Sequence, residues 1–269
     1  MAYKIEKAHL LEVLKEANYD TTKDEVITAV NNLSKLWKEE DKTTNGGEVS
    51  TSPARSPLFL GDWRILSAPN FPNRIINNED KDTSFQYTLG RISFNMFQPK
   101  HLVVTICHPE NGVLNVVHKS DNLHHLEYED VATYQLVMNI IIHTDNGDLP
   151  AEVFMEGHCF PESDIRMKVG FTSGTLRKGP SIDKDEKLTQ LWDDTFRDAY
   201  AKADEERGYM ESFLQWTIKK MMKITFPTDE SMRYEMKRVI HGYFDILFLD
   251  EDMRITKGNR GSIVITTRE

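Results

Sequence analysis

The sequence predicts a mainly β protein, a lipocalin-like antiparallel β-barrel with an N-terminal helical segment and a helical insertion before the last strands. Two observations support this prediction. After residue 58, apolar and polar residues alternate in short runs that are separated by Gly, Asn, Asp and Pro. Before residue 37, and again between residues 183 and 238, apolar residues recur at helical spacing instead.

The N-terminal part of the chain predicts two short helices over residues 1–37. Leu10 and Leu14 fall on one face of the first, and Val26 and Val30 begin an apolar stripe on the second. Residues 38–57 contain almost nothing apolar, so we expect a polar linker there. The β-barrel domain is then expected over residues 58–269.

The β domain is predicted from runs in which every second residue is apolar. The clearest runs are Ile92, Phe94 and Met96; Leu102, Val104 and Ile106; Tyr134, Leu136, Met138, Ile140 and Ile142; and Ile165, Met167, Val169 and Phe171. Each such strand has one apolar face, which needs a shared interior. A closed barrel supplies that interior and also removes exposed sheet edges.

The period changes again near the C-terminus. Residues 183–238 carry apolar residues at helical spacing with charged residues opposite, which predicts two or three amphipathic helices. Alternation returns at Gly242 and continues to the end, with turns expected at 250–252 and 258–261. Glycine at the second turn supplies the positive φ that a tight hairpin requires.

Composition excludes several classes of protein. The 269-residue chain has a net charge of −10. It therefore lacks the electrostatic footprint of a nucleic-acid binder and the broad positive field that holds a protein to an anionic membrane. We expect no nucleic-acid partner. The two cysteines, Cys107 and Cys159, are too few for a disulfide framework and indicate buried free thiols.

The C-terminal motifs resemble a known family. Leu249-Asp250-Glu251, Arg254-Ile255-Thr256 and Gly258-Asn259-Arg260-Gly261-Ser262 are similar to the closing hairpin of plastid lipid-associated proteins, the fibrillins. Two earlier stretches agree with this resemblance: Leu60-Gly61-Asp62-Trp63-Arg64-Ile65-Leu66 and Leu89-Gly90-Arg91-Ile92. Lys257 stands where arginine is common in the family, and the 183–238 segment is longer than the family pattern.

The resemblance implies a lipocalin-like fold and association with lipids, carotenoids or quinones of photosynthetic membranes or lipid bodies. We expect a non-enzymatic binding or structural protein without a cofactor. Its partner would be a hydrophobic small molecule or lipid, and it would make peripheral contact with a thylakoid or plastoglobule. Residues 1–15 resemble neither a secretory signal nor a transit peptide, and no spanning helix is evident. The expected location is a plastid or a cyanobacterial cell, as a soluble or peripheral protein.

Two other functions stay open. The first is an enzyme in the same barrel that acts on an isoprenoid or carotenoid, for which a buried Asp or His facing the cavity would be the mark. The second is a scaffold that docks a protein partner through the helices of 183–238. That segment carries a methionine stripe suited to an adaptable surface, formed by Met210, Met221, Met222 and Met232.

The candidate ligand-binding residues are large apolar side chains of the strands and two arginines: Trp63, Phe94, Met96, Tyr134, Met138, Phe171, Arg254 and Arg260. Trp63 either lines a ligand cavity or plugs the closed end of the barrel. The two arginines can hold a carboxylate or phosphate head group. The interpretation we favour is that they pair with an acidic residue of their own hairpin, Asp250, Glu251 or Asp252. Tyr243 and Asp245 are candidate members of that polar cluster.

Patterns that suggest catalysis or metal binding are weak. His124 and His125 lie near His118 and Glu127, but adjacent side chains on an extended segment point to opposite faces, so we expect no metal site. The neighbouring Cys107 and His108 rarely attain the geometry of a nucleophile and its base. The sequence contains no Gly-x-Ser-x-Gly elbow and no phosphate-binding loop. We therefore predict no catalytic residue.

Overall fold

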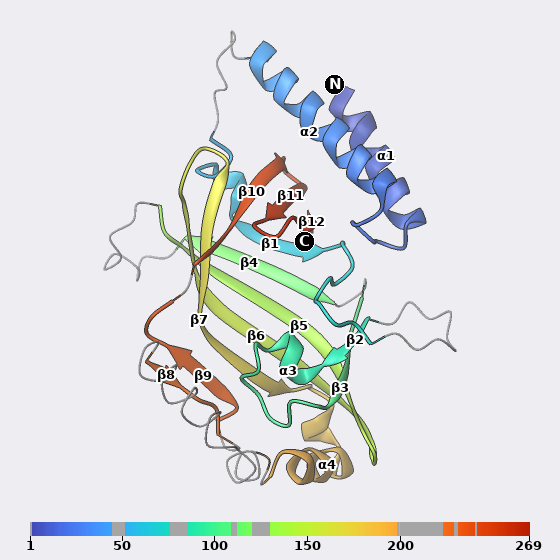
Figure 1. The fold of residues 1–269 in the computed structure, drawn as a ribbon, viewed down its shortest axis with the longest axis vertical. Coiled ribbons are helices and arrows are strands. Elements are labelled where there is room, and N and C mark those ends of the chain that lie inside the picture. The colour runs from blue at the N-terminus through green and yellow to red at the C-terminus, as the bar shows by residue number, and fades with distance from the viewer. Residues whose placement is uncertain are drawn as a thin grey trace.

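The computed structural model describes residues 2–44, 52–75, 85–108, 112–119, 130–197, 199, 223–228, 231–239 and 241–269. The protein is mainly antiparallel β with N-terminal helices (Figure 1). The helices are α1 (Ala2–Glu16), α2 (Asp24–Thr44), α3 (Leu89–Ile92) and α4 (Glu186–Phe196), with short 3-10 turns at Pro57–Phe59 and Ile182–Lys184. The strands are β1 (Gly61–Ile65), β2 (Phe85–Thr88), β3 (Val103–Ile106), β4 (Val113–Lys119), β5 (Ala132–Thr144), β6 (Gly147–Pro161), β7 (Arg166–Lys178), β8 (Ile224–Thr225), β9 (Arg233–Met236), β10 (Gly242–Leu249), β11 (Met253–Gly258) and β12 (Ile263–Arg268).

Eight strands pair side by side in a continuous ring. The order is β1, β4, β5, β6, β7, β10, β11 and β12, and β12 pairs with β1 again. Every pairing is antiparallel. The long strands β5 and β7 extend past this ring, where their far halves pair with β3 and β9 instead. Four strands, β2, β3, β8 and β9, thus widen the sheet at one end.

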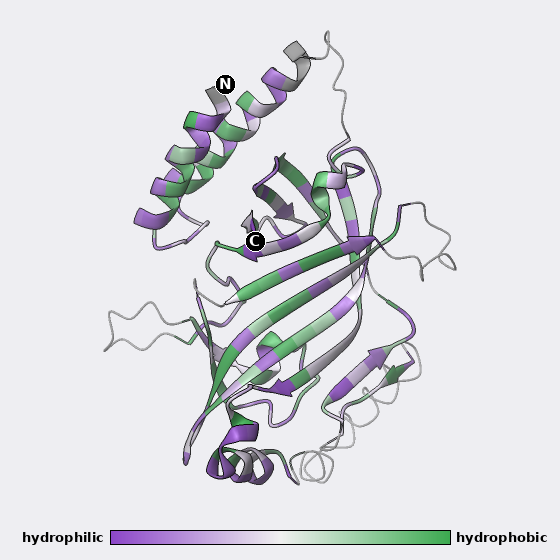
Figure 2. Cartoon of the chain, turned by 180° about the vertical axis from the view of Figure 1, so that it is seen from behind, coloured by the Kyte–Doolittle hydropathy of each residue, from purple (hydrophilic) through white to green (hydrophobic). Residues whose placement is uncertain are grey.

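Strand register defines which side chains face into the ring. Directly paired residues point to the same side of a sheet, and successive residues point to opposite sides. Bands of hydrophobic and hydrophilic colour follow one another along the long strands (Figure 2). Ile255 on β11 packs against the helices outside the ring, so its neighbour Arg254 faces inward. The pairings Trp63–Asn115, Asn115–Leu136 and Leu136–Met155 continue the inward face around the ring.

Buried residues form three clusters. One fills the ring and includes Trp63, Val117, Cys159 and Ile246. A second, larger cluster lies at the widened end, where α4 contributes Trp192 and Phe196 and β9 contributes Tyr234. The third lies between the helix pair and the outer face of β10–β12. It contains Leu10, Leu14, Val26, Ala29, Val30, Leu33, Phe248, Met253, Ile255, Ile263 and Ile265.

The N-terminal helices were predicted and are present. Leu10 and Leu14 of α1 and Val30 and Leu33 of α2 are all completely buried, so both apolar stripes face the sheet. Helix α2 continues from Asp24 to Thr44 and so extends into the segment expected as a polar linker. Residues 45–51 of that segment lie outside the described residues.

Two predicted elements differ in the structure. The strand predicted from Ile92, Phe94 and Met96 is wrong, because Leu89–Ile92 is a short helix in which Leu89 and Ile92 both reach the core at a spacing of three residues. After this helix Phe94 and Asn95 adopt positive φ and end the run. The helical interpretation of 183–238 is right for α4 and wrong at β8 and β9, where β9 fills the edge of β7 that β10 does not reach.

The middle of the 183–238 segment is not described: residues 198, 200–222, 229 and 230 lie outside the described residues, and with them Met210, Met221 and Met222. Met232 is described and is buried in the cluster at the widened end of the sheet. Among the helices that the structure describes, none combines the length and the apolar character needed to cross a membrane.

Candidate ligand-binding site inside the strand ring

Arg254 is a charged side chain buried inside the ring. It lies on β11 between Met253 and Ile255, which pack outward against the helices, so the alternation of the strand directs its guanidinium inward. Only 3% of the residue is exposed. A buried arginine is rare unless it is paired, so its partners determine what this position can do.

The described residues satisfy Arg254 only in part. Its Nη2 donates a hydrogen bond to Oδ1 of Asn115 on β4. The guanidinium carbon lies 4.9 Å from the ring centre of Phe59 and 4.8 Å from that of Trp63, which gives two cation–π contacts. Nε and Nη1 are buried and have no hydrogen-bond partner among the described residues.

The positive charge of Arg254 is not neutralised by a negatively charged side chain among the described residues. Burial lowers the pKa of Arg254 to about 10, which still leaves it a cation at neutral pH. Arg268 adds a second positive charge near Arg254. The other ionisable neighbours are Tyr134 and Cys159, and burial raises the pKa of each to about 12. Both neighbours are therefore neutral at pH 7. Within the described chain no carboxylate forms an ion pair with Arg254.

Apolar side chains beside this cation keep some accessible surface. Tyr134 and Leu136 face inward on β5 and are only partly buried, whereas Ala132 and Met138 on the same face are buried. Val169 and Phe171 on β7 are also inward-facing and partly buried. The arrangement therefore combines a buried cation with an adjoining apolar face.

Gly157 on β6 lies between two of these aromatic side chains. It pairs with Tyr134 on one side and Phe171 on the other, and the two rings approach to 5.9 Å between their centres. Glycine adds no side chain to the inward face at this point, which leaves that surface to the two rings.

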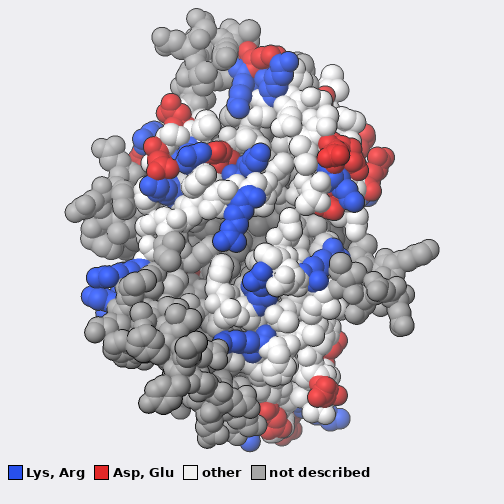
Figure 3. All heavy atoms as spheres, viewed as in Figure 1, with Lys and Arg blue, Asp and Glu red and all other residues white. Residues whose placement is uncertain are grey.

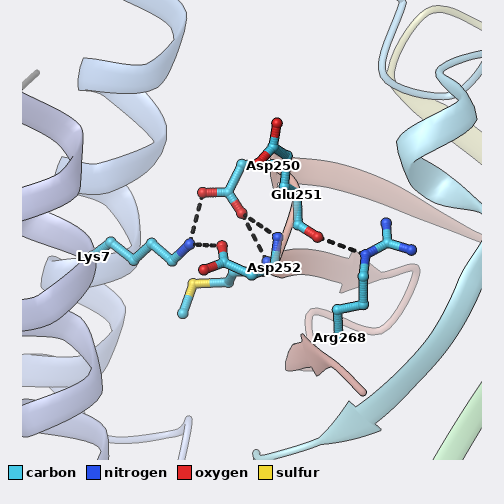
Figure 4. A network of polar contacts seen from close by, with 6 residues as sticks. Lys7, Asp250, Glu251, Asp252 and Arg268 are labelled. Atoms are coloured by element: carbon cyan, nitrogen blue, oxygen red, sulfur yellow. Dashed lines mark hydrogen bonds and ion pairs between the residues drawn. The ribbon is translucent and has the colours of Figure 1, made fainter.

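The favoured pairing of Arg254 with its own hairpin is wrong. Asp250 and Asp252 instead accept hydrogen bonds from Lys7 Nζ of α1, and the backbone carbonyl of Glu251 accepts one from Arg268 (Figure 4). The acidic turn is therefore engaged by a helix that is distant in sequence, which packs on this side of the hairpin while Arg254 faces the other side.

The other predicted members of that polar cluster also have different partners. Asp245 pairs with Arg166 at 2.6 Å, and the Arg166 guanidinium lies 4.2 Å from the ring centre of Tyr243. Arg260 is exposed in the β11–β12 turn.

A hollow lies between α1 and the acidic turn. Its volume is about 770 Å³, and its walls combine charged and apolar side chains. The residues that line it are Tyr3, Lys4, Lys7, Ala8, Leu11, Trp37, Pro53, Ser56, Leu58, Leu249, Asp250, Glu251 and Asp252. Burial would lower the pKa of Lys7, but its hydrogen bonds to Asp250 and Asp252 outweigh this and raise it. Lys7 is thus held as a cation that links α1 to the sheet.

Replacing Lys7 by methionine is expected to lower the free energy of unfolding by about 1–2 kcal/mol, because Asp250 would lose its counter-charge in a largely buried position. The Lys7 and Asp250 side chains are only 15% and 17% exposed. Urea denaturation measures the change. The matched control is Lys35→Met, whose exposed pair with Glu39 at 4.0 Å should contribute less than about 0.5 kcal/mol. Equal effects of the two variants would contradict this role for Lys7.

The structure brings together some of the predicted ligand residues and separates others. Trp63, Tyr134, Phe171 and Arg254 meet inside the ring. Trp63 is completely buried and its Nε1 donates to the Phe59 carbonyl at 3.1 Å, as a core plug would. Met138 is buried at the widened end, where Met96 packs partly exposed, and Phe94 is 60% exposed after α3.

Sequence reasoning missed Phe59, Asn115 and the role of Cys159 as a neighbour of Arg254. Asn115 had a recognisable signal, because it takes the inward position between Val113 and Val117 in an otherwise apolar alternation. Phe59 had none, since it lies on a short turn before β1 and reaches the ring only through tertiary packing.

Patterns that hinted at other chemistry lie away from this site. The Cys107 thiol has its pKa raised by burial, and the ring Nε2 of His108 is hydrogen bonded to the Leu66 carbonyl at 2.7 Å, so the two do not form a nucleophile–base pair. His118 lies 3.6 Å from Asp62 on the exposed side of β4. His124, His125 and Glu127 lie outside the described residues.

His158 is buried but does not lie inside the ring. His158 lies between Gly157 and Cys159, which face inward, so its own side chain faces outward and contacts His241 at 2.9 Å between the Nε2 atoms. On the face seen in Figure 3, basic side chains lie among uncharged atoms in the middle of the view.

Comparison with protein families identifies a match over the C-terminal half of the chain. A family model described as PAP_fibrillin matches residues 116–267, which is more than half of the chain and includes Tyr134, Phe171 and Arg254. Searches of curated proteins and of solved structures find no match.

Proposed function

This chain belongs to the PAP/fibrillin family of plastid lipid-associated proteins, and from that premise we propose that it is a non-enzymatic lipid-associated protein that binds an apolar or amphiphilic ligand inside its strand ring. In this proposal the ring acts as a lipocalin-like barrel. The family assignment supports a role with lipids, carotenoids or quinones at thylakoids or plastoglobules, and a plastid or cyanobacterial setting in which the protein is soluble or peripheral.

The observation that carries the proposal is the set of partly accessible apolar side chains on the inward face: Tyr134, Leu136, Val169 and Phe171. A ring of eight strands is just wide enough to hold one small ligand. Burying each methylene of such a ligand contributes about 0.8 kcal/mol, so a long acyl or isoprenoid tail gains on the order of 10 kcal/mol before the entropic cost of association.

The enzyme alternative has less support. Its expected mark was a buried Asp or His facing the cavity, whereas His158 faces outward. Around Arg254 lie the Arg268 guanidinium and two further ionisable groups, a phenol and a thiol. Burial keeps both of these neutral near pH 7. The docking alternative rests on a methionine stripe that falls mostly outside the described residues.

The test fills the inward face with one large side chain. We expect Leu136→Trp to reduce ligand binding at least about tenfold, because its indole would occupy the space beside Tyr134. The matched control is Val137→Trp, the next residue on β5, which is equally half-buried and faces outward. Native mass spectrometry with organic extraction, on protein purified from a pigment-containing host, measures the retained carotenoid, quinone or lipid.

Two results would contradict the proposal. One is equal retention of ligand by Leu136→Trp and Val137→Trp, since binding would then not involve the inward face. The other is an unmodified protein that carries no ligand and takes up none from added lipid or quinone.

A further inference from the structure

We propose that Arg254 and Asn115 form a receptor inside the ring for the oxyanion head group of a long-chain amphiphile, with a carboxylate as the simplest case. This inference rests on the proposed function and adds the chemical class of the ligand. The apolar tail would lie along the inward face formed by Tyr134, Leu136 and Phe171.

Arg254 is a buried side chain with N–H groups that donate to no described residue. Two of its three guanidinium nitrogens, Nε and Nη1, are buried without a hydrogen-bond partner among the described residues. Asn115 holds the third, Nη2, and thereby orients the side chain. Buried polar groups are nearly always hydrogen bonded, so Nε and Nη1 are suited to donate to an acceptor on a ligand.

The acceptor for the Arg254 guanidinium should be negatively charged. The aromatic faces of Phe59 and Trp63 offset part of the desolvation of the cation but cannot accept N–H bonds in the plane of the guanidinium. Tyr134 and Cys159 are neutral near pH 7, and Arg268, which stacks at 4.4 Å on the same Trp63 ring, carries the same sign of charge as Arg254.

Arg268 and Arg254 differ in how fully the chain satisfies their hydrogen-bond donors. Arg268 donates to three backbone carbonyls, those of Leu58, Leu60 and Glu251. It is thus satisfied by the chain itself. Arg254 contacts the same tryptophan but has one hydrogen-bond partner among the described residues. The difference indicates that Arg268 has a structural role and Arg254 has a ligand-binding one.

An amphiphile suits the site formed by Arg254 and Asn115 better than a free small anion does. The chain carries a net charge of −10, so its overall field does not concentrate anions. A small ion would also have to enter past apolar side chains without gaining from them. An acyl chain gains from that same surface, because Tyr134 and Phe171 contact each other beside the partly exposed Leu136 and Val169.

The experiment compares a matched pair of ligands. Dodecanoate and dodecanol are titrated into the full-length protein at pH 8, where the acid is ionised, and tryptophan fluorescence or calorimetry reports binding. We expect dodecanoate to bind about 10- to 100-fold more tightly than dodecanol, the range for a hydrogen bond to a buried charged group. In Arg254→Met the ratio should fall to about one.

Controls separate the head-group role from folding. Arg260→Met removes an exposed arginine of the same hairpin and should leave the ratio unchanged. Arg254→Gln removes the charge while keeping a donor for Asn115, so it should also lose the preference even if Arg254→Met folds poorly. A purely structural Arg254 predicts the opposite pattern, in which both neutral variants lose stability against urea and keep the ratio of the wild type.

The outcomes distinguish the two proposals. If dodecanoate and dodecanol bind equally tightly to the wild type, the head-group receptor is wrong and the apolar binding function stands. If neither ligand binds, the head-group receptor is wrong, and the carotenoid, quinone or lipid retained in the native mass spectrometry experiment decides the apolar binding function. If acetate or inorganic phosphate alone binds as tightly as dodecanoate in an Arg254-dependent way, the site takes free anions and the amphiphile assignment is overturned.

Discussion

Trp63→Ala is expected to lower the free energy of unfolding by about 3–5 kcal/mol, the range for removing a large buried aromatic side chain. Trp63 is completely buried on β1, the strand that pairs with both β4 and β12. Its indole donates to the Phe59 carbonyl and makes cation–π contacts with two guanidinium groups, those of Arg254 and Arg268. The substitution would therefore leave a cavity and also withdraw a cation–π partner from a buried charge.

Urea denaturation followed by far-UV circular dichroism measures this change. Phe94→Ala is the matched control, because it also removes an aromatic side chain that the sequence marked as a candidate ligand residue. Phe94 is 60% exposed, so its loss should alter the free energy of unfolding by less than about 0.5 kcal/mol. Similar losses for both variants would contradict the assignment of Trp63 to the core of the ring.

Phe248→Ala is expected to lower the free energy of unfolding by about 3–5 kcal/mol as well, through a different part of the molecule. Phe248 is completely buried on the outer face of β10, where its ring centre lies 5.9 Å from that of Tyr3 and 5.6 Å from that of Trp37. These contacts join both N-terminal helices to the sheet. Their loss should loosen the helix pair before the ring unfolds.

Limited proteolysis and urea denaturation test this together. In Phe248→Ala, cleavage within residues 2–44 should become faster than in the wild type, while Ile5→Ala serves as the control because Ile5 on α1 is 75% exposed. Unchanged cleavage of the helices would show that Phe248 does not hold them. A loss of stability in Ile5→Ala equal to that in Phe248→Ala would also contradict the prediction.

Local patterns were sufficient for the class of fold and for the family. Strands with alternating apolar residues, such as β5 and β7, are readable because half of each strand must face the interior, and the helix pair is readable from its period. The C-terminal motifs around Arg254 indicated the PAP/fibrillin family, which the family model confirms. Short segments were misread where tertiary packing overrides periodicity, as at α3 and β9.

The candidate site shows where local information ends. From the sequence alone, Asp250, Glu251 and Asp252 are the nearest acidic residues to Arg254, so pairing within the hairpin was the natural expectation. The folded chain instead supplies Lys7 from the first helix to that turn and directs Arg254 to the other face of β11, against Asn115 from β4. The alternation of apolar residues is a property of each strand and can be read along it. The partner of a buried charge depends on which distant segments share its side of the sheet, and only the closing of the ring and the docking of the helices decide that.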